Sequence, residues 1–113
     1  MSTLDQLNCT PLTASSVALT GAEIGRNLAE ISQWHLIEKD GNQRLERVFK
    51  CKDFNDALAF TIRIGQAAKD QDHHPAILTE WGQVTVNWWT HKVKGLHLND
   101  FIMAAKTDGL YGQ

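Results

Sequence analysis

The amino-acid sequence predicts an α+β domain: a four-stranded antiparallel sheet with about three helices packed on one face, in the order α-β-β-α-β-β-α. Apolar residues recur at helical spacing in three segments, and four short segments have the composition of strands. Neighbouring strand segments are joined by short turns, which antiparallel strands allow and parallel strands do not. A chain of 113 residues is long enough for one core and too short for two.

The first helix is predicted to begin at Thr20. Residues 1–19 are polar and without a clear period, which indicates a loosely ordered N-terminal extension. Thr20 and Glu23 have the spacing of a capping box, in which a hydroxyl and a carboxylate each satisfy a free amide at the start of a helix. Ile24 and Leu28 then begin an apolar stripe. We therefore expect a single domain over residues 20–113.

A β-hairpin is expected next. Residues 34–38 have the composition of a strand, and Asp40-Gly41-Asn42 is a strong turn signal. Residues 43–52 fit the partner strand, although Arg47 falls on its apolar face and Val48 on its polar face.

The longest helix is predicted over residues 54–69, with Asp53 as its N-cap. Its apolar arc is roughly 220° wide, against roughly 100° for a helix that covers one core. The excess indicates either a second apolar contact, such as another subunit, or a fuller intramolecular core. The arc contains Phe54, Leu58, Phe60, Ile62, Ile64, Ala67 and Ala68.

A second hairpin and a last helix complete the expected domain. Residues 76–79 and 84–90 read as two strands around a turn at Gly82. The later strand shows the clearest alternation of apolar and polar side chains in the chain. Asp100 is expected in the first turn of the last helix.

Composition excludes several classes of function. The formal net charge of −2, from 11 basic and 13 acidic residues, argues against nucleic-acid binding, which needs a concentrated basic surface. No apolar run approaches the length of a membrane span, and the first residues do not resemble a secretory signal. Cys9 and Cys51 are too few for a disulfide framework, so we expect two reduced thiols in a cytoplasmic protein.

Three of the histidines are the best candidates for chemistry: His73 and His74, which precede a proline, and His91 at the end of the last strand. A strand, turn and strand between them can bring His91 back beside the pair. Free imidazoles exchange protons near neutral pH, and the neighbouring Asp72 and Asp70 can orient or charge them. Neutral imidazoles can instead hold zinc, although the usual ligand spacings are absent. Solvent-exposed loop histidines remain the third interpretation.

Other candidates are weaker. His35 and His97 are expected at the surface or at element boundaries. Trp81, Trp88 and Trp89 suit either stacking on a flat heterocycle or a place in the core or an interface. Cys51 reads as a small core residue.

The pattern Lys69-x3-His73-His74-Pro75-x5-Trp81-x9-His91-x8-Asp100 resembles the signature of the pterin-4a-carbinolamine dehydratases. Residues 49–55 resemble that family's strand-to-helix junction. The stretches 78–82 and 94–101 are similar to bacterial members that accompany phenylalanine hydroxylase. The resemblance covers about residues 23–108, nearly the whole predicted domain.

The resemblance implies a four-stranded antiparallel sheet with helices on one face, assembled as a homodimer or homotetramer. It implies dehydration of 4a-hydroxytetrahydropterin to quinonoid dihydropterin, without a metal or a separate cofactor, for an aromatic amino acid hydroxylase. By position, His73 and His91 would be acid–base residues, and His74 would hold the pterin and its 4a-hydroxyl. Asp72 would help to bind and orient the substrate, and Thr90 would line the site.

One position departs from the family pattern. Many members have an acidic residue where this chain has Lys69, and a lysine there favours neutral imidazoles. Asp70 is the nearest substitute. Two other functions stay open: a non-catalytic dimerisation or regulatory module of the same fold, and a metal-dependent hydrolase. The sequence does not distinguish a biopterin-like substrate from another pterin, or a dimer from a tetramer.

Overall fold

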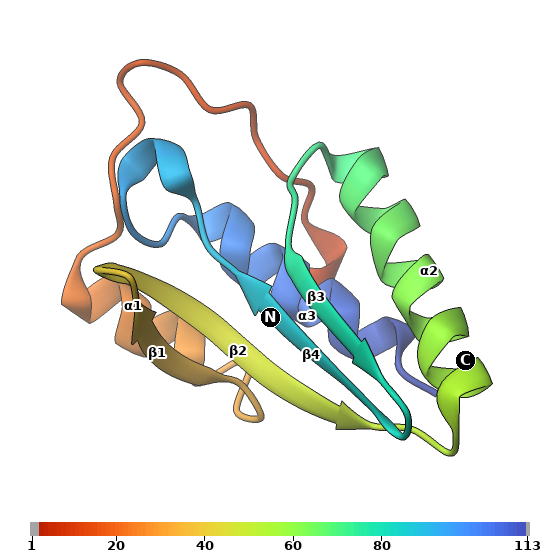
Figure 1. Ribbon diagram of the computed structural model, residues 1–113. Coiled ribbons are helices and arrows are strands. Elements are labelled where there is room, and N and C mark those ends of the chain that lie inside the picture. Colours follow the sequence, from red (N-terminus) through yellow and green to blue (C-terminus); the bar gives the residue numbers. More distant parts are fainter. Residues whose placement is uncertain (1–2, 113) are drawn as a thin grey trace.

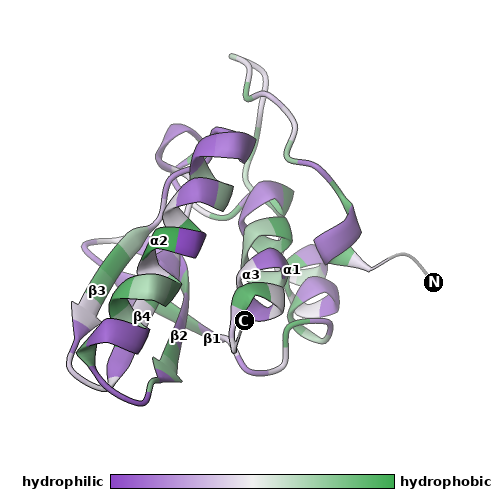
Figure 2. Ribbon diagram, turned by 90° about the vertical axis from the view of Figure 1, so that its right-hand side faces the viewer, coloured by the Kyte–Doolittle hydropathy of each residue, from purple (hydrophilic) through white to green (hydrophobic). Residues whose placement is uncertain are grey.

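The computed structural model describes residues 3–112, and its order of helices and strands confirms the predicted α+β fold. A four-stranded antiparallel sheet forms one layer, and the helices cover one of its faces (Figures 1 and 2). The elements are α1 (Gly21–Leu28), β1 (His35–Lys39), β2 (Asn42–Lys50), α2 (Phe54–Gln71), β3 (Ala76–Glu80), β4 (Gln83–Trp88) and α3 (Leu98–Leu110), with two 3-10 turns, η1 (Leu4–Gln6) and η2 (His91–Val93).

The sheet has the strand order β1-β2-β4-β3. Tight turns close the two hairpins, and each uses residues with positive φ: Asp40 and Gly41 in the first, Gly82 in the second. The hairpins meet along β2 and β4, where Leu45 pairs with Trp88. The predicted strands are therefore correct to within one or two residues at each end, and β4 stops at Trp88, short of Thr90.

Local signals place the first two helices as predicted. The Thr20 hydroxyl accepts from the Glu23 amide at 3.2 Å, and the Glu23 carboxylate accepts from the Thr20 amide at 2.8 Å. The Asp53 carboxylate caps α2 by accepting from the Asp56 amide at 2.8 Å. Both caps satisfy backbone donors that lack a partner within the helix.

The long helix α2 uses only part of its apolar arc for the core. Its buried side chains are Ala57, Phe60, Ile64 and Ala68. Phe54, Leu58 and Ile62 form an adjacent apolar stripe that stays open to solvent, with Ile62 52% exposed. The core of the described residues is therefore complete without this stripe, which remains available for another contact.

The polar residue on the apolar face of β2 has a partner across the core. Arg47 Nη1 lies 2.7 Å from the Asp108 carboxylate, which also accepts from Trp34 Nε1 at 2.8 Å. The Arg47 guanidinium lies 4.2 Å from the centroid of the Phe49 ring. This ion pair between β2 and α3 explains why the alternation of the strand is broken at this position.

The N-terminal segment has no regular structure apart from η1, yet it lies against the domain at several points. Leu4 is buried in the core. Residues 7–19, which we call the N-terminal strap, run from η1 across the molecule to α1 (Figure 1). The Cys9 amide donates to Gln71 Oε1 at 2.7 Å, and the Leu19 amide donates to the Leu96 carbonyl at 2.8 Å. Within residues 3–112, no helix has the length and hydrophobicity that crossing a membrane requires.

Candidate functional site

The end of α2 positions the first two histidines. Asp72 adopts the left-handed conformation, with φ 52° and ψ 44°, and the His73 amide donates to the Ala68 carbonyl at 3.1 Å. This is the bonding of a Schellman motif, which ends a helix and turns the chain sharply. His73 consequently points inward and is only 6% exposed, whereas His74 lies on the surface.

A buried carboxylate holds His73 from the other side. Asp100, in the first turn of α3, is fully buried, and its Oδ1 lies 2.6 Å from His73 Nε2. Its Oδ2 accepts from the Thr90 hydroxyl at 2.7 Å and from the His97 amide at 2.9 Å. Three donors therefore satisfy one buried carboxylate, which joins the end of α2, the end of β4 and the start of α3.

The His73 ring is fixed by stacking as well. It lies nearly parallel to the indole of Trp88, with 5.8 Å between ring centroids and 9° between planes. Trp88 is itself buried and donates from Nε1 to the Thr107 hydroxyl at 3.1 Å. Because an ionised carboxylate only accepts hydrogen bonds, the tautomer that suits this contact carries its N–H on Nε2 and donates it to Asp100, which leaves Nδ1 of His73 for proton exchange.

The chain after β4 positions the third histidine. Thr90 bridges to Gly95 through an amide-to-carbonyl bond of 3.1 Å, and the intervening loop forms η2, which begins at His91. The His91 ring lies edge-on to Trp89, with 4.9 Å between centroids. The Arg44 guanidinium covers the same indole at 3.7 Å. The Trp89 indole therefore packs against both the Arg44 guanidinium and the exposed His91 imidazole.

The three histidines line one pocket of about 240 Å³. All five residues predicted from the sequence as substrate-binding contribute to its walls: Asp72, His73, His74, Thr90 and His91. Leu12, Trp89 and Lys92 complete the lining. His91 therefore lies on the same side of the sheet as the histidine pair, as the spacing allows.

A second hollow, of about 340 Å³, adjoins this pocket. The two share Leu12, Asp72, His73 and Lys92 as walls. The remaining lining comes from the strap, at residues 9–11, and from Gln71 and Asn99.

Electrostatic contacts differ between the buried and the exposed histidines. His74 Nε2 lies 4.0 Å from the Asp72 carboxylate, but both side chains are largely in solvent, so this pair contributes little. The contact of His73 with Asp100 is short and buried, where solvent does not weaken it.

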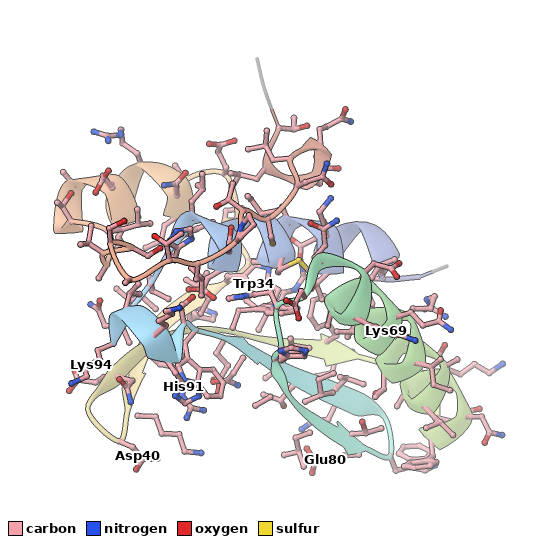
Figure 3. All side chains as sticks on the ribbon, turned by 90° about the horizontal axis from the view of Figure 1, so that it is seen from above. Trp34, Asp40, Lys69, Glu80, His91 and Lys94 are labelled. Carbon is pink, nitrogen blue, oxygen red and sulfur yellow. The ribbon has the colours of Figure 1, made fainter. Side chains whose placement is uncertain are left out.

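Several sequence candidates lie elsewhere. Trp81 is 74% exposed and follows Glu80 at the far end of β3 from the histidine pair. Lys69 is exposed on α2, well apart from His91 in Figure 3. Asp70 lines a different hollow with Lys106, so it does not take over as a pocket carboxylate. His35 is exposed on β1.

Two roles were missed by sequence reasoning. His97, expected at a boundary, is the N-cap of α3: its Nδ1 accepts from the Asn99 amide at 3.0 Å. Burial lowers the pKa of His97 against the opposing effect of Asp100, which keeps Nδ1 free to accept. The sequence puts Asp100 in the first turn of the last helix and at the end of the family signature, without assigning it a contact with His73. The spacing of His97 and Asp100, that of a capping box, was the available signal.

The described residues hold no cluster of three His, Cys, Asp or Glu side chains arranged for a metal ion. Cys9 and Cys51 are free thiols. Burial raises the pKa of Cys9 to about 11 and raises that of Cys51 as well, so neither is an activated nucleophile.

This antiparallel α+β domain brings three imidazoles to one pocket, with a buried carboxylate behind one of them. Comparison with known proteins identifies its family. The family model for pterin 4 alpha carbinolamine dehydratase matches residues 17–110. This chain belongs to the pterin-4a-carbinolamine dehydratase family.

Individual relatives agree with this assignment. A protein of Microcystis aeruginosa is 50% identical over 113 residues, covering 100% of this chain and 97% of the relative. A protein of Marinobacter nauticus is 50% identical over 111 residues, covering 98% of this chain and 100% of the relative. Both are provisionally named pterin-4-alpha-carbinolamine dehydratases. A crystal structure from Brucella melitensis, described as a transcriptional coactivator/pterin dehydratase, matches with TM-score 0.77 and 32% identity, covering 84% of this chain and 99% of that one.

Proposed function

We propose that this protein dehydrates 4a-hydroxytetrahydropterin to quinonoid dihydropterin by histidine general acid–base catalysis, as a hydro-lyase. The observation that carries the proposal is the lining of one pocket by His73, His74 and His91, with His73 held by a buried carboxylate. Membership of the dehydratase family supplies the substrate class.

The reaction needs one proton delivered and one removed. The N5 lone pair of the substrate expels the 4a-hydroxyl, which leaves as water once an imidazolium has protonated it. A neutral imidazole or water then takes a proton from the cationic imine. Positioned acid–base groups contribute about 10²–10⁴-fold to such steps. We assign these two transfers to His73 and His91, which approach the pocket from different elements.

The other lining residues bind and orient the substrate in this proposal. His74, exposed beside the pocket, holds the pterin and its 4a-hydroxyl, and Asp72 and Thr90 complete the binding site. The Thr90 hydroxyl donates to Asp100, so Thr90 acts mainly by fixing the carboxylate behind His73. The scheme uses no metal and no cofactor besides the pterin substrate.

The experiment is an assay of the absorbance of the 4a-hydroxypterin during turnover of an aromatic amino acid hydroxylase. The unaltered protein should accelerate its decay, and His73→Ala and His91→Ala should abolish the acceleration. His35→Ala is the matched control, because His35 is an exposed histidine on β1 outside the pocket. Full activity in both pocket variants would refute the assigned roles.

A second candidate is a non-catalytic dimerisation or regulatory module. The description of the Brucella relative as a coactivator as well as a dehydratase favours it, and so does the exposed apolar stripe of α2. This role would survive loss of the histidines. A stable protein partner found in the absence of any pterin turnover would support it over the dehydratase.

We also propose the setting in which the enzyme works. A cytoplasmic location agrees with the free thiols of Cys9 and Cys51. The reaction product would return to an aromatic amino acid hydroxylase, in particular phenylalanine hydroxylase. A homodimer or homotetramer would cover the apolar stripe of α2, which the described residues leave exposed.

A further inference from the structure

The N-terminal strap closes one side of the candidate site, and this gives the site a second compartment. We propose that the hollow between the strap and His73 is a subsite for the substituent at C6 of the reduced pterin, a short hydroxylated chain. The inference rests on the proposed function, since it assigns the reacting ring to the adjoining histidine pocket. It concerns what the 340 Å³ hollow binds.

The strap is attached to both helices that carry the site. Cys9 is bound through its amide to Gln71, the last residue of α2. Two hydrogen bonds join Thr10 to the Asn99 side chain. The Thr10 amide donates to Asn99 Oδ1 at 2.9 Å, and Asn99 Nδ2 donates to the Thr10 carbonyl at 2.8 Å. Asn99 is buried and directly precedes Asp100. The end of α2 and the start of α3 therefore hold the strap, and the same two helix ends position His73 and its partner Asp100.

One side chain of the strap reaches both compartments. Leu12 lines the histidine pocket and the adjoining hollow, whereas Cys9 lines the hollow alone and Leu19 packs against the hydrophobic core. Leu12 is half-buried although it follows the exposed Pro11. Its position marks the boundary that a ligand occupying both compartments would contact.

The chemistry of the substrate explains why its substituent would lie here. In a reduced pterin, N5 joins the reacting C4a to C6, so a C6 substituent leaves the ring beside the reacting edge. If the 4a-hydroxyl of the bound pterin contacts His73, the C6 substituent therefore lies next to His73 as well, and His73 is part of the wall of the second hollow. The hollow carries one cationic and one anionic side chain, Lys92 and Asp72, together with strap backbone, which suits hydroxyl groups.

Most of the strap, residues 7–16, precedes the part of the chain that the family model matches. The family model begins at residue 17, whereas the Microcystis relative aligns with the whole of this chain. The three histidines of the pocket therefore lie within the matched part, whereas Leu12 precedes it, so differences in substrate preference among relatives can rest on the strap.

The test compares two probes, 7,8-dihydropterin and its 6-(1,2-dihydroxypropyl) derivative. We would measure their affinities for the unaltered protein, for Leu12→Ala and for Val17→Ala, a matched control because Val17 is an exposed apolar strap residue. The derivative should bind about tenfold more tightly to the unaltered protein and to Val17→Ala. This preference should fall below about threefold in Leu12→Ala.

A second readout follows the hollow directly. In a Cys51→Ala background, Cys9 is the only thiol of the chain, and because it is half-buried and lines the hollow, a group bound there should shield it from a thiol reagent. The derivative should slow this reaction more than dihydropterin does when both are saturating.

The outcomes separate the two proposals. Equal affinities for the two probes, with equal Cys9 reactivity, would overturn the subsite and leave the dehydratase function standing. Failure of both probes to bind would overturn the pterin site and the subsite together. A preference that Leu12→Ala leaves intact would show that the strap does not form the wall.

Discussion

Asp100 connects more of the site than any single histidine does. Its carboxylate receives the His73 ring, the Thr90 hydroxyl and the His97 amide while fully buried. A buried carboxylate with three donors is held in one position, and it fixes the tautomer of the imidazole that it contacts. Asp100 is therefore a positioning residue for His73 in the proposed reaction.

Replacing Asp100 by asparagine should impair turnover more than substrate binding. The amide has one acceptor oxygen where the carboxylate has two, so one of the three donors loses its partner and His73 loses its fixed tautomer. We expect kcat to fall by about 10² or more, within the range that general acid–base catalysis contributes. Steady-state dehydratase kinetics across pH would measure it.

Asp108→Asn is the matched control for this change. Asp108 is also a carboxylate of α3 with two partners, Arg47 and Trp34, and it lies outside the histidine pocket. It should lower stability and leave kcat of the folded protein near its original value. If both variants kept the original kcat and pH profile, Asp100 would have no positioning role.

His97 should make stability depend on pH. Burial lowers its pKa in the folded protein, so the unfolded chain binds a proton more readily. The contribution of His97 is therefore complete above about pH 6.5, the usual histidine pKa, and is lost as the pH falls below it. Urea unfolding at pH 7.5 and 5.5 should show the decrease.

His97→Asn isolates this effect from the neighbouring Asp100 and His73. Asparagine is a good N-cap and does not titrate, so the variant should keep the start of α3 and lose less stability between the two pH values. The same decrease in both proteins would assign the pH dependence to other groups.

At this scale the sequence indicated which histidines line the pocket and missed what holds them. The pair His73 and His74 stood out because adjacent histidines before a proline have few structural uses, whereas their reactivity stays a prediction. The role of Asp100 depends on a contact across 27 positions of the chain, which residue spacing alone does not reveal. His97 was overlooked because histidine is an uncommon cap.

Among the elements, the end of α2 has the clearest structural requirement. Asp72 occupies the left-handed region, which costs an L-residue about 1–2 kcal/mol unless it is Gly, Asn or Asp. The requirement comes from the Schellman motif that turns His73 inward. The same residue lines the pocket, so backbone and charge effects must be separated by experiment.

Two substitutions at Asp72 separate them. Asp72→Asn tolerates the left-handed conformation and removes the charge, so it should keep stability and raise KM if the carboxylate binds the pterin. Asp72→Val should also destabilise the protein, by about 1–2 kcal/mol. Denaturant unfolding and dehydratase kinetics would measure the pair. Unchanged KM in Asp72→Asn would remove Asp72 from the binding site.

Elements were predictable where the signal is local. The capping box at Thr20, the cap at Asp53 and the turns at Gly41 and Gly82 each lie within a few residues of the structure they specify. The exact end of β4 could not be predicted in this way, because at Thr90 a bridge to Gly95 replaces pairing with a neighbouring strand.

At the scale of the whole molecule, the turn residues predict the two hairpins, but they do not predict that the hairpins pair with each other through β2 and β4. No turn connects β2 to β4, and this pairing is decided by burial of Leu45, Phe49, Val84 and Val86 beneath the helices. The sheet order β1-β2-β4-β3 places the ends of β4 and α2 together, which creates the histidine pocket.

The exposed apolar stripe of α2 makes oligomerisation testable. Burying a side chain of this size contributes about 1.5–3 kcal/mol, and a carboxylate in its place would oppose an apolar interface. We therefore expect Ile62→Glu to shift the protein toward smaller species in sedimentation velocity at equal concentration. The fold should persist, because Ile62 is 52% exposed and outside the core.

Gln33→Glu provides the control for this substitution. It adds the same charge at an exposed polar position outside α2, in the turn before β1, so it should leave the distribution of species unchanged. If Ile62→Glu and Gln33→Glu sedimented alike, the stripe would not be a subunit contact. Because the stripe lies away from the C-terminal end of α2, which carries His73, the smaller species should keep dehydratase activity if each pocket is complete within one chain. Loss of activity in step with dissociation would show that a second subunit contributes to the site.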